Sequence, residues 1–388
     1  MPFLKLVLGA TVLFSVAAPL AAAHTTHFVP QEHPTIASAV GNAQDGDTII
    51  ISTGTYAEAV VVDGFTGLTI KGKGKVIIDP PGSADGITLT GCDTCTVEKL
   101  HVTGAVNGLR LVDCFTCTVS KCKVDGVSGI GVALEGCNNC FVEKCTITGA
   151  GTDGIGVGAN GTDACPLAHI SKNKIIEPGD DGVDLNGDNG IIEKNTVIDA
   201  GGNGYRTEGV PAATTNSFVK CKSIGAQGNG FEINGASNSI FFCTDIESAG
   251  NGVHCSGTVA HQLLSHKSTK AGGTGILVEA GLDGSGIDTC KIKQPGADGI
   301  SMQSNAAVLT KNKVTAAGND GFAVGGNGGF YEKNSAMKCT SDGFQLIGTG
   351  NELTKNKAKG SKTGFDLNDQ SVGGNIIDDD NTFGTTGP

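Results

Sequence analysis

Short runs that alternate between apolar and small or polar residues recur along nearly the whole chain, and most follow a glycine. Examples are DGITLTG, NGLRLVD, DGVDLNG, NGFEING and DGFQLIG. Such alternation is typical of β-strands with one buried face, and these runs lack the spacing of an amphipathic helix. The chain is therefore expected to be all-β. Its predicted inward residues are Ile87 and Leu89, Leu109 and Leu111, Ile155 and Val157, Val183 and Leu185, Phe231 and Ile233, Ile300 and Met302, Phe322 and Val324, and Phe344 and Leu346.

The glycines that precede these runs recur at a mean step of about 23 residues. They are Gly86, Gly108, Gly129, Gly154, Gly182, Gly204, Gly230, Gly252, Gly275, Gly299, Gly321, Gly343 and Gly364. A repeat of strands and turns at this length predicts a parallel β-solenoid in which each repeat is one coil. Thirteen glycines predict about 13 coils. We expect the glycines to supply positive φ at the turns.

A second position recurs nine residues before the next repeat glycine, and it holds a small polar residue, a thiol or a histidine. It comprises Cys145, Asn173, Asn195, Cys221, Cys243, His266, Cys290, Asn312 and Asn334. Side chains at such a position are expected to form an internal ladder.

Three closely spaced cysteine pairs, Cys92/Cys95, Cys114/Cys117 and Cys137/Cys140, are expected to be stacked core thiols. Disulfides along the stack and a zinc site are the alternatives.

Residues 1–23 have the features of a secretory signal peptide: a basic start, an apolar run and small residues before His24. We therefore expect a secreted protein, or a periplasmic one in a Gram-negative bacterium. No later run is apolar for long enough to span a membrane. The net charge of -12 argues against nucleic acid as a partner, and the absence of Trp argues against broad aromatic platforms for sugars.

The outward side chain next to each repeat glycine defines a column along the rod. It is predicted to contain Thr88, Arg110, Gly131, Gly156, Asp184, Arg206, Glu232, His254, Leu277, Ser301, Ala323, Gln345 and Asp366. Asp184 to His254 are consecutive titratable residues and form one patch. A second outward column adds Asn186, Glu208, Asn234, Ser256 and Glu279. The patch is either a functional site or a ladder of ion pairs that stabilises the stack. Asp181, by contrast, aligns with turn residues and is expected to be one.

Two long turns flank the Asp184 coil: VGANGTDACPLAH and RTEGVPAATTNS. They either wall a groove or are insertions that the fold tolerates. The segment PTIASAVGNAQDGDTIIISTGTYAEAVVV, residues 34 to 62, resembles the N-terminus of the pectin-lyase-like superfamily. The resemblance implies a right-handed, single-stranded parallel β-helix, with TIASAV as a short capping helix. It divides the mature chain into a cap and first coil, 24–62, and β-helix repeats, 63–388. The DPH motif of mannuronan epimerases and the GxxDF motif of pectin methylesterases are absent. TDG and GDDG imitate polygalacturonase motifs, but the repeat itself generates such strings.

This superfamily includes polysaccharide lyases, hydrolases, esterases, epimerases and binding proteins, so the resemblance alone selects no reaction. Together with the charged patch and the two long turns, it leads us to expect that the chain binds and modifies a polysaccharide along the face from Asp184 to His254, as a uronan lyase or epimerase. Arg206 would then neutralise a sugar carboxylate and His254 would be the base. Asp184 and Glu232 would hold calcium, which superfamily lyases often use. Substrate contacts are expected from Asn186, Glu208, Asn234, Ser256 and Arg110. The alternatives are an inverting glycoside hydrolase that uses two of Asp184, Glu208 and Glu232, and a non-catalytic structural, adhesive or glycan-binding rod.

Overall fold

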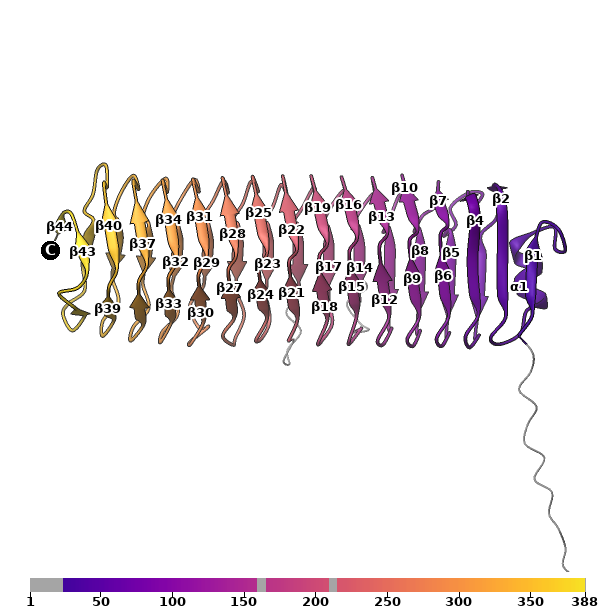
Figure 1. Cartoon of the computed structure of the whole chain (residues 1–388), viewed down its shortest axis with the longest axis horizontal. Helices are drawn as coiled ribbons and strands as arrows, with labels where there is room; N and C mark the ends of the chain where they lie inside the picture. The colour runs from indigo at the N-terminus through magenta and orange to yellow at the C-terminus, as the bar shows by residue number, and fades with distance from the viewer. Residues whose placement is uncertain (1–23, 159–164, 209–214, 388) are drawn as a thin grey trace, which may run out of the picture.

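Each coil of the chain pairs with the next through parallel strands, and the coils stack into an elongated rod (Figure 1). The computed structural model describes residues 24–158, 165–208 and 215–387. Two expectations concern residues outside this part of the chain. They are the signal peptide, 1–23, and the centres of the two long turns, 159–164 and 209–214.

In the part of the chain that the structure describes, two parallel sheets run along the rod. The smaller sheet has 15 strands: β3 (Val60–Asp63), β5 (Ile87–Thr90), β8 (Leu109–Val112), β11 (Val132–Glu135), β14 (Ile155–Val157), β17 (Val183–Leu185), β20 (Tyr205–Thr207), β23 (Phe231–Ile233), β26 (Val253–Cys255), β29 (Ile276–Val278), β32 (Ile300–Met302), β35 (Phe322–Val324), β38 (Phe344–Leu346), β41 (Leu367–Asp369) and β44 (Thr386–Gly387). The larger sheet has 29 strands and starts with β1 (Thr26–Val29), β2 (Thr48–Tyr56) and β4 (Thr69–Ile78). It then receives two short strands from each coil, beginning with β6 (Thr96–Glu98) and β7 (His101–Thr103).

The stack has about 16 turns rather than the predicted 13. Coils at the two ends were missed because they lack the marker glycine: Ala59 precedes β3, and Thr385 precedes β44. The predicted capping helix is confirmed as α1 (Ile36–Asn42), whose first turn is capped by the hydroxyl of Thr35. No helix among the described residues is long and apolar enough to cross a membrane.

The repeat glycines serve a different purpose from the predicted one. They are not among the residues with positive φ; instead, the next coil lies too close for a side chain. A Cβ on Gly299 would lie 2.4 Å from the carbonyl oxygen of Gly321 and 2.2 Å from a methyl group of Val314. Two aligned positions were also wrong. Strand pairing places Gly131, not Gly129, and Asp366, not Gly364, at the repeat position.

The predicted core is confirmed. All the inward residues listed for the first strands are buried. The internal ladder also forms: the side-chain oxygen of Asn195 accepts the backbone N–H of Asn173 at 2.8 Å, and the same contact joins consecutive coils further along. The six thiols of the three cysteine pairs are buried and free, which confirms stacked core thiols rather than disulfides. The thiol of Cys117, for example, donates to the carbonyl of Cys92 at 3.4 Å.

Replacing a repeat glycine should disrupt the stack. We expect Gly299→Ala to lower the free energy of unfolding by about 2 to 4 kcal/mol, because the new methyl group overlaps the next coil. Urea denaturation would measure the change. Gly41→Ala is the matched control, since Gly41 lies in α1 with nothing within 4 Å of the added atom. That variant should be neutral or more stable by up to about 1 kcal/mol; equal losses in both variants would contradict the steric explanation.

A buried carboxyl makes stability depend on pH. Asp245 lies fully inside the coil of β25 (Thr244–Ile246), where its side chain accepts from Ser248 and Ser268, and burial raises its pKa to about 7. Between its ordinary pKa and about 7, the folded state binds a proton that the unfolded state has lost, so stability should fall as pH rises. The slope is about 1.4 kcal/mol per pH unit. Asp245→Asn should remove this contribution. In unfolding measurements from pH 4 to pH 8, the stability difference between the two proteins should change steadily up to about pH 7 and stay constant above it.

Candidate functional site

Four titratable side chains lie on consecutive coils of the smaller sheet. Strand register pairs Asp184 of β17 with Arg206 of β20, Arg206 with Glu232 of β23, and Glu232 with His254 of β26. Their strand neighbours are buried, so these four face outward. The centre of the predicted column is therefore confirmed. Its ends need correction: Ala133, not Gly131, pairs with Arg110, and Asn368, not Asp366, pairs with Gln345.

Arg206 joins three carboxyl groups. One terminal nitrogen of its guanidinium lies 3.6 Å from Asp184 and 3.7 Å from Asp181, and the other lies 2.9 Å from Glu208. The side chain of Arg206 is 39 % exposed, whereas that of Asp184 is only 13 % exposed. The guanidinium thus separates a sheltered carboxyl from a half-exposed one, and both remain within reach of one ligand.

Burial shifts the proton equilibria of the aspartates around Arg206. It raises the pKa of Asp184 to about 7, against the opposing effect of Arg206, and the pKa of Asp153 to about 6. Burial also raises the pKa of Asp181. Among the described contacts, Oδ1 of Asp184 has no hydrogen-bond partner. A carboxyl in this state holds its proton for about half of the time at neutral pH and is able to donate it.

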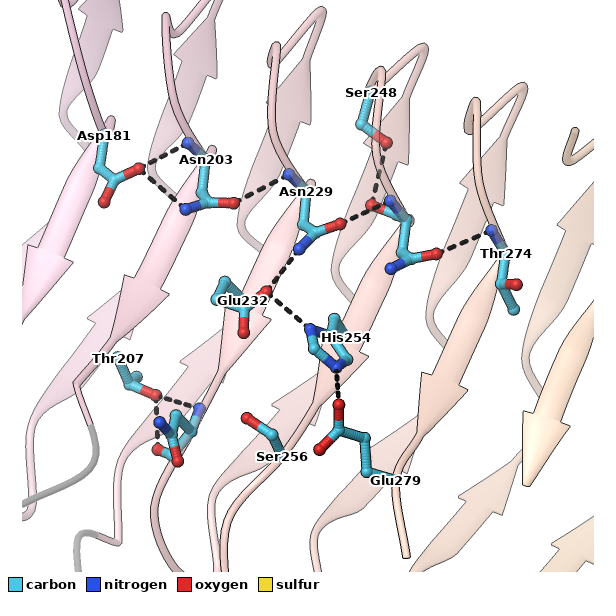
Figure 2. A network of polar contacts seen from close by, with 12 residues as sticks. Asp181, Asn203, Thr207, Asn229, Glu232, Ser248, His254, Ser256, Thr274 and Glu279 are labelled. Carbon is cyan, nitrogen blue, oxygen red and sulfur yellow. Dashed lines mark hydrogen bonds and ion pairs between the residues drawn. The ribbon is translucent and has the colours of Figure 1, made fainter. Parts of the chain in front are cut away.

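Asp181 occupies the turn position that the sequence predicted. Its carboxylate accepts the backbone N–H of Asn203, and the same contact continues to Asn229, Asn251 and Thr274 (Figure 2). Asp153 precedes it in this ladder and accepts from the backbone of Asp181. Sequence reasoning missed that Asp153 and Asp180 belong to the site. The signal was present, because TDG and GDDG occupy the same frame in adjacent coils.

His254 is held between two carboxylates. Its Nδ1 lies 2.9 Å from Glu232 and its Nε2 lies 2.9 Å from Glu279 (Figure 2). The hydrogen bond to Glu232, more than the burial that opposes it, raises the pKa of His254 to about 9. At neutral pH the ring is therefore an imidazolium without a free lone pair. This geometry argues against the predicted role of His254 as a base.

The other predicted residues divide between the site and its surroundings. Glu208 joins the site through Arg206. Arg110 lies three coils before Asp184 and forms a two-pronged ion pair with Glu135. Asn186 is buried rather than outward, and Asn234 and Ser256 are partly exposed next to the Glu232 and His254 strands. The structure therefore separates Arg110 and Asn186 from the exposed patch.

A cation would fit a different set of residues from the predicted one. Arg206 lies between Asp184 and Glu232 in the register, so these two carboxylates do not share one ion without displacing it. An oxygen atom from each of Asp153, Asp180 and Asp181 lies within 4.8 Å of the others. Oxygen ligands of this kind suit calcium. Calcium binding stays a prediction.

The comparisons with known proteins agree on the fold. A family model described as "Right handed beta helix region" matches residues 43–168, 107–266 and 251–387. No curated protein matches the sequence. Among solved structures, an alginate lyase from Paenibacillus sp. str. FPU-7 aligns with 15 % identity over 63 % of this chain and 95 % of its own, at a TM-score of 0.51.

Two further structures align over more of the chain. The catalytic domain of a GH87 alpha-1,3-glucanase in complex with tetrasaccharides has 12 % identity over 94 % of this chain and 71 % of its own, at a TM-score of 0.54. The receptor binding domain of the Siphovirus 9NA tailspike has 13 % identity over 86 % of this chain and 76 % of its own, at a TM-score of 0.57. At these identities the likeness shows the fold alone.

The pKa of His254 tests the arrangement around it. In an NMR titration of the histidine ring protons, His254 should titrate near pH 9. Glu232→Gln should lower this pKa more than Glu279→Gln does, because the contact with Glu232 contributes most to the shift. A midpoint near the ordinary value of 6.5 in the unmodified protein would show that His254 does not lie between the two carboxylates.

Proposed function

This chain belongs to the family of right-handed β-helix proteins, and on that basis we propose that it binds a polysaccharide across strands β17 to β26 and hydrolyses it. The observation that carries the proposal is Asp184, an outward but sheltered carboxyl whose pKa is about 7. Such a group is suited to general acid catalysis at neutral pH. The carbohydrate-acting neighbours support the substrate class in general terms.

Asp184 and Glu208, the carboxyl groups at the two terminal nitrogens of Arg206, can act as the general acid and the general base of hydrolysis. Asp184 would donate its proton to the glycosidic oxygen as the bond to the sugar breaks. Glu208, whose carboxylate accepts from the opposite nitrogen of Arg206, would take a proton from the water that attacks the sugar carbon. Inverting hydrolases keep their two carboxyls about 6.5 to 9.5 Å apart so that this water fits between them. A guanidinium between the two groups is consistent with such a separation.

The charge of this face favours a neutral polysaccharide. Six carboxyl groups, Asp180, Asp181, Asp184, Glu208, Glu232 and Glu279, surround two cationic groups, Arg206 and His254. A polyanion would be repelled unless a cation intervened. A lyase or epimerase also needs a base beside a free cationic group, and here the cationic groups are engaged by carboxylates. The alpha-1,3-glucan named for one structural neighbour is a neutral substrate of the favoured kind.

The reaction can be identified by proton NMR of the purified protein with neutral glucans, pectate and alginate, each with and without calcium. New reducing ends of inverted configuration would support hydrolysis. Olefinic signals or exchange at C5 in deuterated water would instead establish the lyase or epimerase. Binding without any chemical change across the panel would leave a glycan-binding rod as the function.

If Asp184 is the acid, its replacement should remove turnover without harming the fold. We expect Asp184→Asn to lower kcat by about a hundredfold or more, with an unchanged or higher Tm because a buried titratable group is lost. In the unmodified enzyme, activity should fall by about tenfold per pH unit above pH 7, as Asp184 loses its proton.

Glu279→Gln is the matched control, because Glu279 lies on the same face but contacts His254 rather than Arg206. It should retain most of the activity. Full activity of Asp184→Asn, or a rate that does not change through pH 7, would contradict the assignment of Asp184 as the acid.

A further inference from the structure

A row of lysines follows one corner of the rod. In each coil, two strands of the larger sheet are joined by a two-residue corner whose first residue has positive φ and whose second residue is the buried ladder position. Nine of these first residues are lysines with φ between 54° and 59°. They are Lys99, Lys121, Lys144, Lys172, Lys194, Lys220, Lys311, Lys333 and Lys355.

The row is interrupted on three consecutive coils. There the corner residues are Phe242, Ser265 and Thr289. A hollow of about 430 Å³ opens at this point, lined by these three residues and by Lys267, Lys291 and Lys311. Phe242 is 52 % exposed, and the hydroxyls of Ser265 and Thr289 are 2.8 Å apart. We call this feature the lysine hollow.

A second column supplies more positive charge. Register places Lys222 of β22 (Lys222–Ile224), Thr244 of β25, Lys267 of β28 (Lys267–Thr269), Lys291 of β31 (Lys291–Lys293) and Lys313 of β34 (Lys313–Thr315) on consecutive coils. Lys267, Lys291 and Lys311 line the hollow, and Lys220, Lys222 and Lys313 lie on the two coils that flank the interruption.

These six lysines have no acidic partner in the described ion pairs. Elsewhere in the row, Lys144, Lys194 and Lys333 each pair with the glutamate that precedes them. At the hollow, that preceding position holds Val219, Phe241, Leu264, Asp288 and Thr310. Its one carboxylate, Asp288, accepts from the hydroxyl of Thr310. Asp288 keeps its negative charge in this contact, and Lys311 also interacts with Glu332 on the next coil. The lysines outnumber these two carboxylates, so the excess of positive charge would attract an anion.

We propose that the lysine hollow binds an anionic saccharide, a sugar unit that carries sulfate or carboxylate. An exposed aromatic ring suits the apolar face of a sugar, the paired hydroxyls suit its hydroxyl groups, and the ammonium groups suit its charge. The coil spacing of about 4.8 Å repeats these ammonium groups along the rod, as a linear polymer requires. This site differs from the acidic site in position and in the sign of its charge, and it does not depend on hydrolysis there.

The test uses the full mature chain and chondroitin sulfate oligosaccharides as the probe, with uncharged dextran as the comparison, in calorimetric titrations at low and moderate salt. We expect the sulfated probe to bind and dextran not to bind at this site. Lys267→Gln with Lys291→Gln should weaken binding by about tenfold or more. Phe242→Ala should weaken it by a smaller factor, and salt should weaken it in all proteins that bind.

The matched control is Lys172→Gln with Lys174→Gln, which removes two exposed lysines from the same corner that do not line the lysine hollow. It should change affinity by less than about twofold. Equal weakening in the two double variants would show diffuse attraction to the lysine row and overturn the site. Polygalacturonate and a single-stranded oligonucleotide of equal charge are two further probes. The proposal would also be overturned if neither chondroitin sulfate nor polygalacturonate bound, or if the oligonucleotide bound more tightly than they do. Turnover at the acidic site should be the same in all these variants, so the two proposals can fail separately.

Discussion

The close approach of consecutive coils at the repeat glycines is the constraint on which the rest of the molecule depends. At Gly182, an added Cβ would lie 2.4 Å from the carbonyl oxygen of Gly204. Only glycine fits this separation without displacing a coil, and the separation holds the parallel strands in one register from coil to coil. Because the register does not drift, every outward position becomes a straight column of side chains. Side chains that can bind or react with a ligand are therefore arranged in columns along the strands and corners rather than gathered on loops.

Stacking also explains why the acidic site has unusual proton equilibria. Asp184 lies between Gly156 and Arg206 in the register, and the adjacent coils shelter its carboxyl from solvent. Loss of hydration favours the neutral acid, while Arg206 favours the charged form, and burial is the larger effect. For His254 the balance is reversed, because direct contact with Glu232 outweighs burial. One column thus contains a carboxyl that is partly protonated at neutral pH and a histidine that is positively charged at the same pH.

The sequence was sufficient for the architecture and for the centre of the site. Alternation and the repeat predicted the buried residues, and the same frame placed Asp184, Arg206, Glu232 and His254 side by side. The alignment of repeat positions from the sequence failed where a coil departs from the repeat. SGIG at residues 128–131 contains two glycines, and only strand pairing shows that Gly131 is the aligned one. The sequence could not predict that His254 would be bound at both nitrogens, since this depends on how the Glu232 and Glu279 side chains reach across coils. The burial of Asn186 was likewise beyond a pattern of alternation.

Net charge is a poor guide to partners for a molecule built in this way. The overall charge of -12 argued against nucleic acid as a partner, yet the structure separates the charges by column. Carboxylates gather on the outer face of the smaller sheet, and lysines follow a corner of the larger one. Ions in solution screen charges over about 8 Å at physiological salt, so a ligand that lies along one column responds mainly to that column. One rod can therefore bind two ligands of different charge. The charge of the coil corner or strand face along which a ligand lies determines which ligand binds there.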